Sequence, residues 1–345
     1  MNRNKWLLVI VFVISCARSY AQVTSWPNIN VEAKPATRWW WMGSAVDKEN
    51  LTRNIKSYAE AGMGTLEITP IYGVQGNDAN EIPFLSPQWM EMLRHTQSEA
   101  HRNGMQIDMN TGTGWPFGSP EVSLEDAASC LLISEYKLKG GERLRVKVEP
   151  EDKTQKAHAV LSRLMGFSDK GVCLDLTLKV DNKGMLNWKA SKGNWRLIAA
   201  FTGKTLQKVK RAAPGGEGYV MDHFSEKSVE NYLARFDKAF SNSKVSYPHN
   251  FFNDSYEVYK ADWTPRFFEE FALRRGYKLE EHLPEFLSEV RSDNTARIIS
   301  DYRETMAELL QENFTKQWTE WAHSHGAKTR NQAHGSPGNL IDLYA

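Results

Sequence analysis

The chain contains 345 residues, and its 43 lysine and arginine residues against 42 aspartate and glutamate residues give a formal net charge of +1. A charge this close to zero creates no long-range field that would hold an anionic membrane surface or nucleic acid, so we expect no nucleic-acid partner. Hydrophobic residues make up 41% and charged residues 25% of the chain, which excludes a polytopic membrane protein and a disordered chain. The length fits either two domains or one large α/β barrel with an insertion.

The first residues have the three zones of a secretory signal peptide. Arg3 and Lys5 form a basic start, an apolar run follows over residues 6–14, and small side chains precede Gln22. Because a membrane span needs about 20 apolar residues, this run is too short to cross a bilayer. We therefore expect cleavage after Ala21 and export to the periplasm or the cell surface.

The cysteines leave two questions open. The segment that ends in Cys16 resembles a lipobox, and processing there would make Cys16 the lipid-bearing first residue of a membrane-anchored protein. If cleavage follows Ala21 instead, Cys130 and Cys173 remain. In an exported chain these two residues could form a disulfide, and two buried free thiols are the alternative.

Extended and helical patterns alternate beyond the signal, as they do in βαβ units. Leu51 and Ile55 recur at helical spacing, and Ser86 followed by Pro87 is a typical helix start. The predicted strands cover residues 38–42, 65–69, 105–110, 249–253 and 328–332. The predicted helices cover residues 48–60, 88–102, 225–240, 264–276 and 294–325.

The periodicity changes from helix-like to strand-like over residues 121–210, where polar and apolar side chains alternate. We expect this segment to form a small β-rich insertion. The chain then divides into a signal peptide, the first part of an α/β barrel, the insertion and the continuation of the barrel, over residues 1–21, 22–120, 121–210 and 211–345.

Five strand–helix units with one insertion favour a (β/α) TIM-type barrel. Such a barrel needs eight strands to close, whereas this chain supplies about five. The expected fold is therefore α/β, with the barrel truncated after about five strands, and an open sheet is the alternative. The chain stops at Ala345 without a capping helix, which favours a fragment of a longer protein that is incomplete at its C-terminus.

Active sites of such barrels lie at the carboxyl ends of the strands, so polar residues there are the first candidates. Asp254 and Glu257 directly follow the fourth predicted strand. Hydrolysis of a glycosidic bond needs a carboxylic acid that protonates the leaving oxygen and a second carboxylate, and Glu257 is the acid that we select. A helix N-terminal charge or a salt bridge is the other interpretation of Glu257. Asp254 could accept a substrate hydroxyl, bind a metal or close a turn.

Substrate contacts are expected from residues near other strand ends. Asn110 ends the third predicted strand, and Gln332 and His334 lie at and after the end of the fifth. Strand alternation turns Trp40 away from its two tryptophan neighbours, so its side chain can line a pocket. Trp115 lies in a glycine-rich loop whose backbone can approach a ligand closely. The same loop lacks the Lys-Ser/Thr ending of a P-loop, so we do not expect nucleotide binding.

Longer motifs occur in a fixed order over nearly the whole chain beyond the signal. They are Trp39-Trp40-Trp41-Met42-Gly43, Glu60-Ala61-Gly62-Met63-Gly64, Leu85-Ser86-Pro87-Gln88-Trp89-Met90, Asn110-Thr111-Gly112-Thr113-Gly114-Trp115-Pro116, Val209-Lys210-Arg211-Ala212-Ala213-Pro214-Gly215-Gly216, Asp254-Ser255-Tyr256-Glu257, Asp262-Trp263-Thr264-Pro265 and Asn331-Gln332-Ala333-His334-Gly335-Ser336-Pro337-Gly338. In order and spacing these motifs resemble the N-terminal half of bacterial α-L-rhamnosidases of glycoside hydrolase family 106.

The resemblance implies an exported barrel enzyme that hydrolyses terminal α-L-rhamnosyl linkages in an oligo- or polysaccharide substrate. It also implies inversion at the sugar, two catalytic glutamates and commonly a calcium ion near the sugar, for which no ligands are assigned. By motif Glu257 resembles the catalytic acid, and the second glutamate is expected in a segment that this chain does not contain. An inactive fragment, a β-galactosidase-like glycosidase for a different sugar and a non-catalytic carbohydrate-binding protein are the alternatives, and the presence of Glu257 argues against the last.

Overall fold

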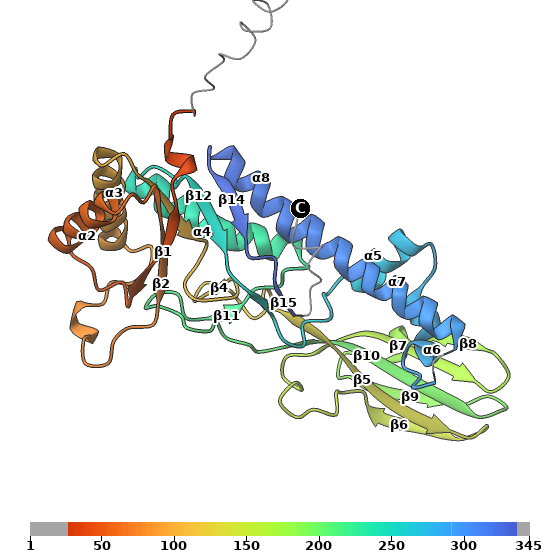
Figure 1. Cartoon of the computed structure of the whole chain (residues 1–345). Coiled ribbons are helices and arrows are strands. Elements are labelled where there is room, and N and C mark those ends of the chain that lie inside the picture. Colours follow the sequence, from red (N-terminus) through yellow and green to blue (C-terminus); the bar gives the residue numbers. More distant parts are fainter. Residues whose placement is uncertain (1–26, 291, 337–345) are drawn as a thin grey trace, which may run out of the picture.

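The computed structural model describes residues 27–290 and 292–336, and one end of the molecule is built on a five-stranded parallel sheet (Figure 1). The neighbours in this sheet follow the order β1-β2-β3-β12-β14, and every pair is parallel. Each of these strands corresponds to one predicted from the sequence. Their bounds are Ala36–Met42 (β1), Thr65–Ile71 (β2), Gln106–Asn110 (β3), Asn250–Asn253 (β12) and Lys328–Asn331 (β14).

Helices connect the strands of this sheet, and four of the described α-helices begin at a capping side chain. The side chain of Asp47 accepts a hydrogen bond from the backbone N–H of Asn50, and that of Ser86 accepts one from Trp89, which satisfies amides that have no partner within the helix. The helices are α2 (Lys48–Glu60), α3 (Pro87–Arg102), α4 (Glu226–Ser243), α5 (Phe267–Arg275), α6 (Leu283–Phe286), α7 (Asp293–Leu309) and α8 (Gln317–Ser324). Among the described residues, no helix has the length and apolar character needed to span a membrane.

The helix predicted over residues 294–325 is one long continuous rod in which a π-helical segment separates two α-helices. Between α7 and α8, residues Leu310–Lys316 form a π-helical segment, η5. Two short pieces before the rod, η4 (Leu279–His282) and α6, were not predicted from the sequence. The rod runs from the parallel sheet toward the β-rich part of the molecule (Figure 1).

The three consecutive tryptophans of β1 divide between the two faces of the sheet. Trp39 and Trp41 are buried on the face that α2 and α3 cover, where Trp41 lies 5.6 Å from the ring of Trp89. Trp40 points to the opposite face and is 45% exposed, as strand alternation requires.

The face that carries Trp40 also holds a chain of charged side chains. Arg38 donates from Nε to Oε1 of Glu67 and from Nη1 to Oδ2 of Asp254, both at 2.9 Å. Arg330 pairs with Glu67 from the other side and lies 3.6 Å from Asp108. The Glu67 side chain is only 3% exposed, so its charge is stabilised mainly by these two guanidinium groups.

A closed barrel is not present in the described part of the chain. The parallel sheet ends at β1 on one side and β14 on the other, so the observed architecture is an open α/β sheet. The expectation of a TIM-type barrel therefore exceeds what this structure contains. The physical reason is geometric, because strand tilt and stagger close such a barrel at eight strands, not five.

Antiparallel strands form a separate β-rich unit at the other end of the molecule (Figure 1). Its larger sheet has the order β5-β10-β7-β8, and β6 pairs with β9. The two sheets enclose their own apolar core around Leu164, Leu186 and Leu197. The bounds are Ser129–Leu138 (β5), Arg143–Lys147 (β6), Val160–Ser168 (β7), Cys173–Asp175 (β8), Met185–Lys189 (β9) and Trp195–Lys204 (β10).

The two cysteines of this unit, Cys130 on β5 and Cys173 on β8, are both free thiols. The strands β10 and β7 lie between β5 and β8 in the sheet, which separates the two side chains. The predicted signal peptide and Cys16 lie outside the described residues.

Candidate active site

Glu257 lies just beyond the carboxyl end of β12, in the two-residue strand β13 (Tyr256–Glu257). This strand pairs in parallel with β15 (Gly335–Ser336), which follows β14. The loops after two neighbouring strands of the parallel sheet are thereby joined around Glu257. Its side chain is 26% exposed, so the carboxylate is accessible to a ligand while most of it is packed.

One oxygen of Glu257 receives three polar contacts. Lys210 Nζ lies 2.5 Å from Oε2, the indole Nε1 of Trp115 donates to Oε2 at 3.1 Å, and the Tyr259 hydroxyl donates to it at 3.2 Å. The hydrogen bond from Lys210 is the main reason that the pKa of Glu257 is lowered, and it outweighs the opposing effect of burial. The same bond raises the pKa of Lys210. This site therefore holds an ionised carboxylate next to an ammonium group.

Lys210 belongs to a segment, residues 207–211, that we call the cationic segment. Backbone bonds fix it to the loop after β3, since Trp115 and Lys210 exchange N–H···O bonds of 3.1 and 2.8 Å. Its Gln207 side chain bonds the carbonyl of Glu257 at 2.6 Å and the N–H of Tyr259 at 2.8 Å. The cationic segment thus connects two strand ends of the parallel sheet.

The close approach between this segment and the glycine-rich loop depends on Gly114. A Cβ at that position would lie 1.9 Å from the carbonyl oxygen of Lys210, and the φ of Gly114 is +54°. A larger residue is excluded by both the contact and the backbone conformation. Asn110 supports the same loop, because its buried Nδ2 donates to the carbonyl of Gly114 at 3.0 Å.

The structure brings some of the other predicted residues near Glu257. Gln332 accepts a hydrogen bond at 2.6 Å from Ser255, two positions before Glu257. His334 has an exposed side chain, and its carbonyl accepts the N–H of Tyr256 at 2.8 Å. These two residues therefore lie beside β13, and Trp115 contacts Glu257 directly.

Asp254 and Trp40 have a different placement. Besides its bond to Arg38, Asp254 accepts the N–H of Ser255 at 2.8 Å, so both of its oxygens have protein partners. This matches the local turn more closely than a free acceptor for a substrate hydroxyl. Trp40 lies on the open face of the sheet, with the Arg38 guanidinium 5.9 Å from its ring.

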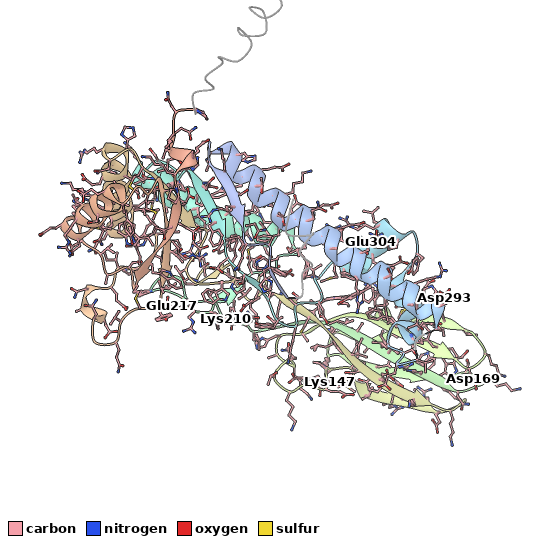
Figure 2. All side chains as sticks on the ribbon, in the orientation of Figure 1. Lys147, Asp169, Lys210, Glu217, Asp293 and Glu304 are labelled. Carbon is pink, nitrogen blue, oxygen red and sulfur yellow. The ribbon has the colours of Figure 1, made fainter. Side chains whose placement is uncertain are left out.

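Sequence reasoning assigned no role to Lys210, Tyr259 or Gln207. Lys210 lies 47 positions before Glu257 and at the end of the expected insertion. It does not follow a predicted strand of the parallel sheet, so a search of the strand ends did not include it. The available signal was its place in the motif Val209-Lys210-Arg211. In Figure 2 Lys210 lies between the parallel sheet and the β-rich unit.

No group of three His, Cys, Asp or Glu side chains gathers within the described ranges in a way that could hold a metal ion. The residues of the site are an ion pair and aromatic side chains. The described residues therefore offer no such set of ligands for the calcium ion that the family resemblance implies.

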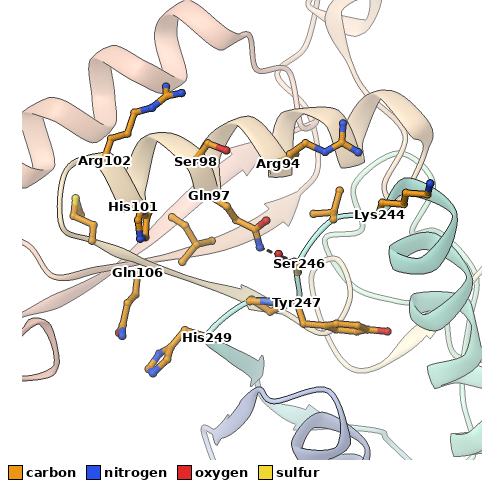
Figure 3. Close-up of a pocket in the computed structure, with 14 residues that line it drawn as sticks. Arg94, Gln97, Ser98, His101, Arg102, Gln106, Lys244, Ser246, Tyr247 and His249 are labelled. Carbon is orange, nitrogen blue, oxygen red and sulfur yellow. Dashed lines mark hydrogen bonds between the residues drawn. The ribbon is translucent and has the colours of Figure 1, made fainter.

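A pocket of about 530 Å³ lies elsewhere, between α3 and residues 244–249, and Figure 3 shows Gln97 of α3 bonded to the carbonyl of Ser246. The pocket reaches the amino ends of β3 and β12, which is the edge of the sheet opposite Glu257. Its basic residues include Arg102 and Lys244, at the C-terminal ends of α3 and α4. Cations there complement the helix dipoles, so we assign the pocket no catalytic role.

The chain is similar to known proteins in sequence and in fold. A family model described as alpha-L-rhamnosidase, glycoside hydrolase family 106, matches residues 27–172 and 152–342. A curated protein of Formosa agariphila, named "Putative beta-glucuronidase", is 26% identical over 358 aligned positions, which cover 91% of this chain and 30% of that protein. The structure of a rhamnosidase from Novosphingobium sp. PP1Y matches with a TM-score of 0.77 at 16% identity, covering 92% of this chain and 48% of that one.

The chain thus spans less than a third of the curated relative and about half of the solved rhamnosidase. The structural match shows a shared fold. The family model covers most of the chain and includes the segments around Trp115, Lys210 and Glu257. The chain belongs to glycoside hydrolase family 106, the alpha-L-rhamnosidase family.

Proposed function

We propose that the full-length protein is an exported glycoside hydrolase that removes terminal α-L-rhamnosyl groups from an oligo- or polysaccharide, with inversion. Family membership supports the reaction class. The observation that carries the assignment to this site is the Glu257 carboxylate beside the indole of Trp115 at the carboxyl edge of the sheet. We also propose that the parallel sheet forms part of a closed (β/α) barrel, as in many glycosidases.

In this proposal Glu257 is the general acid. An inverting glycosidase needs one carboxylic acid at the leaving oxygen and one carboxylate that activates water on the opposite face of the sugar. The hydrogen bond from Lys210 lowers the pKa of Glu257 and so favours its ionised form, and the acid form therefore requires that the ammonium group separates from the carboxylate when the sugar enters. Exclusion of water by the sugar acts in the same direction, because desolvation raises a carboxyl pKa.

Trp115 has two roles in the proposed mechanism. Its Nε1–H orients the Glu257 carboxylate, and its ring offers a flat apolar face to the sugar. Tyr259 donates to the same oxygen, Oε2, at 3.2 Å. The carboxylate is therefore held in one orientation before substrate binds, which lowers the entropy lost in reaching the reactive geometry.

A second candidate is a glycosidase that acts on a different sugar. The relative from Formosa agariphila, which aligns with 91% of this chain, carries the name of a beta-glucuronidase. Glu257 would keep its role in such an enzyme, and the residues around the sugar would differ. We rank this candidate second because the family model names α-L-rhamnosidase.

The test compares Glu257→Gln with the unaltered full-length protein on aryl α-L-rhamnosides of good and poor leaving groups. Loss of a general acid slows cleavage by roughly 100- to 10,000-fold when the leaving group is poor, and an activated leaving group needs little protonation. We expect a large loss on the poor substrate and a small loss on the activated one. Glu230→Gln, which alters an exposed carboxylate on α4, is the matched control.

Equal losses on both substrates would show that Glu257 acts as a base or in substrate binding. Unchanged turnover on both would remove it from the chemistry. Parallel assays with aryl β-glucuronides and β-galactosides decide between the two candidate functions, because only the correct sugar should be released by the unaltered protein.

A further inference from the structure

The cationic segment carries three positive charges, and Glu257 is paired with one of them. Lys208, Lys210 and Arg211 lie within four consecutive positions. Lys210 is paired with Glu257, and the ammonium of Lys208 lies 3.2 Å from the centroid of the Tyr219 ring. Arg211 is the third cation, and its surroundings differ from those of the two lysines.

The Arg211 side chain is exposed and, among the described residues, has no carboxylate partner. Its guanidinium lies over the ring of Tyr72, 5.2 Å from the centroid. Glu217, six positions further along the chain, accepts a bond from the N–H of Gly215 at 2.8 Å, and the described residues include no ion pair between it and Arg211. The five N–H donors of a guanidinium are therefore directed at solvent or at a ligand.

The backbone at Arg211 is both strained and fixed. Its φ is +59°, a conformation that a non-glycine residue adopts only at some energetic cost and that is common at binding sites. Its carbonyl accepts the N–H of Tyr72, the residue after β2, at 3.0 Å. The charge is thus held at a defined position, one residue along the chain from the lysine that contacts Glu257.

We propose that Arg211 binds the carboxylate of a uronic acid that adjoins the glycosidic bond cleaved at Glu257. This inference rests on the proposed function for the position of the cleaved bond. A guanidinium pairs with a planar carboxylate through two parallel N–H···O bonds, which a lysine cannot do. The ring of Tyr72 lies beneath the guanidinium and holds it in place through a cation–π contact.

The test measures binding of methyl galactopyranosiduronate and of its uncharged methyl ester by titration calorimetry on the full-length protein. Neither ligand contains rhamnose, so binding is scored separately from rhamnosidase activity. We expect the free acid to bind about tenfold more tightly than the ester, and this preference to weaken at high salt because a partly exposed ion pair is screened. Thermal melts confirm that each variant is folded.

Arg211→Gln should abolish the preference for the acid, and Arg211→Lys should retain only part of it. Lys227→Gln, which removes an exposed charge on α4, should leave the preference unchanged. The proposal is overturned if the unaltered protein binds acid and ester equally or binds neither, or if Arg211→Gln keeps the preference. Equally tight, Arg211-dependent binding of galactose 6-sulfate would overturn the assignment to a carboxylate.

Discussion

Replacing Glu67 by glutamine tests whether the charged chain on the open face of the sheet stabilises the fold. The substitution keeps the size of a 3% exposed side chain and removes the charge between Arg38 and Arg330. Breaking a fully buried ion pair costs about 3–5 kcal/mol. Here the Arg38 and Arg330 side chains are 31% and 48% exposed, and each keeps a second carboxylate, Asp254 or Asp108. Solvent and these partners reduce the expected loss to about 1–3 kcal/mol.

The assay is urea unfolding followed by fluorescence, with Glu91→Gln as the control. Glu91 pairs with Lys48, and their side chains are 51% and 52% exposed, so solvent screens this pair and its loss should change the stability little. Because the Glu91 pair is exposed and the Glu67 side chain is buried, we expect Glu67→Gln to lower the free energy of unfolding clearly more than Glu91→Gln does. Equal losses in the two variants would refute the reasoning from burial, and a more stable Glu67→Gln protein would show that the buried charges are unfavourable.

Three further predictions follow from the pKa shifts and exposures. Lys210→Met removes the main cause of the lowered pKa of Glu257, so the descending limb of the pH profile of kcat/KM, which reports the free enzyme, should move to higher pH; an unmoved limb would contradict this. Burial lowers the pKa of His223 to about 3, so the folded protein keeps this imidazole neutral while the unfolded chain protonates it below about pH 6.5. The contribution of the neutral His223 to stability is therefore present above pH 6.5 and is lost as the pH falls toward 3. His223→Phe should therefore flatten the pH dependence of the urea midpoint in that window, and an equally steep dependence would be evidence against it. Maleimide should label the exposed Cys173 before Cys130, the pKa of which burial raises to about 11; mass spectrometry that finds the reverse order would contradict the burial of Cys130.

The elements that the sequence predicted well are those whose causes are local. The helix over Lys48–Glu60 has apolar residues at helical spacing, and the structure has the same bounds. The helix predicted over 264–276 instead begins at Phe267, because its first residues form a turn. The π-helical segment Leu310–Lys316 could not be predicted, because the apolar residues of the long helix continue through it without a break in their spacing.

The candidate site shows the same division between local and distant causes. Glu257 and Trp115 both follow strands of one parallel sheet, so sequence reasoning could place them on a common edge. The contact between Asp254 and Arg38 spans 216 positions, and no local pattern indicates it. Lys210 was missed for the same reason, since its position depends on how the β-rich unit returns to the sheet.

The short connection from the β-rich unit back to the parallel sheet affects any attempt to exchange the β-rich unit between related proteins. The last strand of the β-rich unit, β10, ends at Lys204, and only two residues separate it from Gln207, which holds Glu257 and Tyr259. A graft that replaces the whole expected insertion, residues 121–210, would therefore also replace the ammonium group of Lys210 that lowers the pKa of Glu257. Modular engineering of this protein should treat residues 205–211 as part of the recipient scaffold, and should place the junction before them.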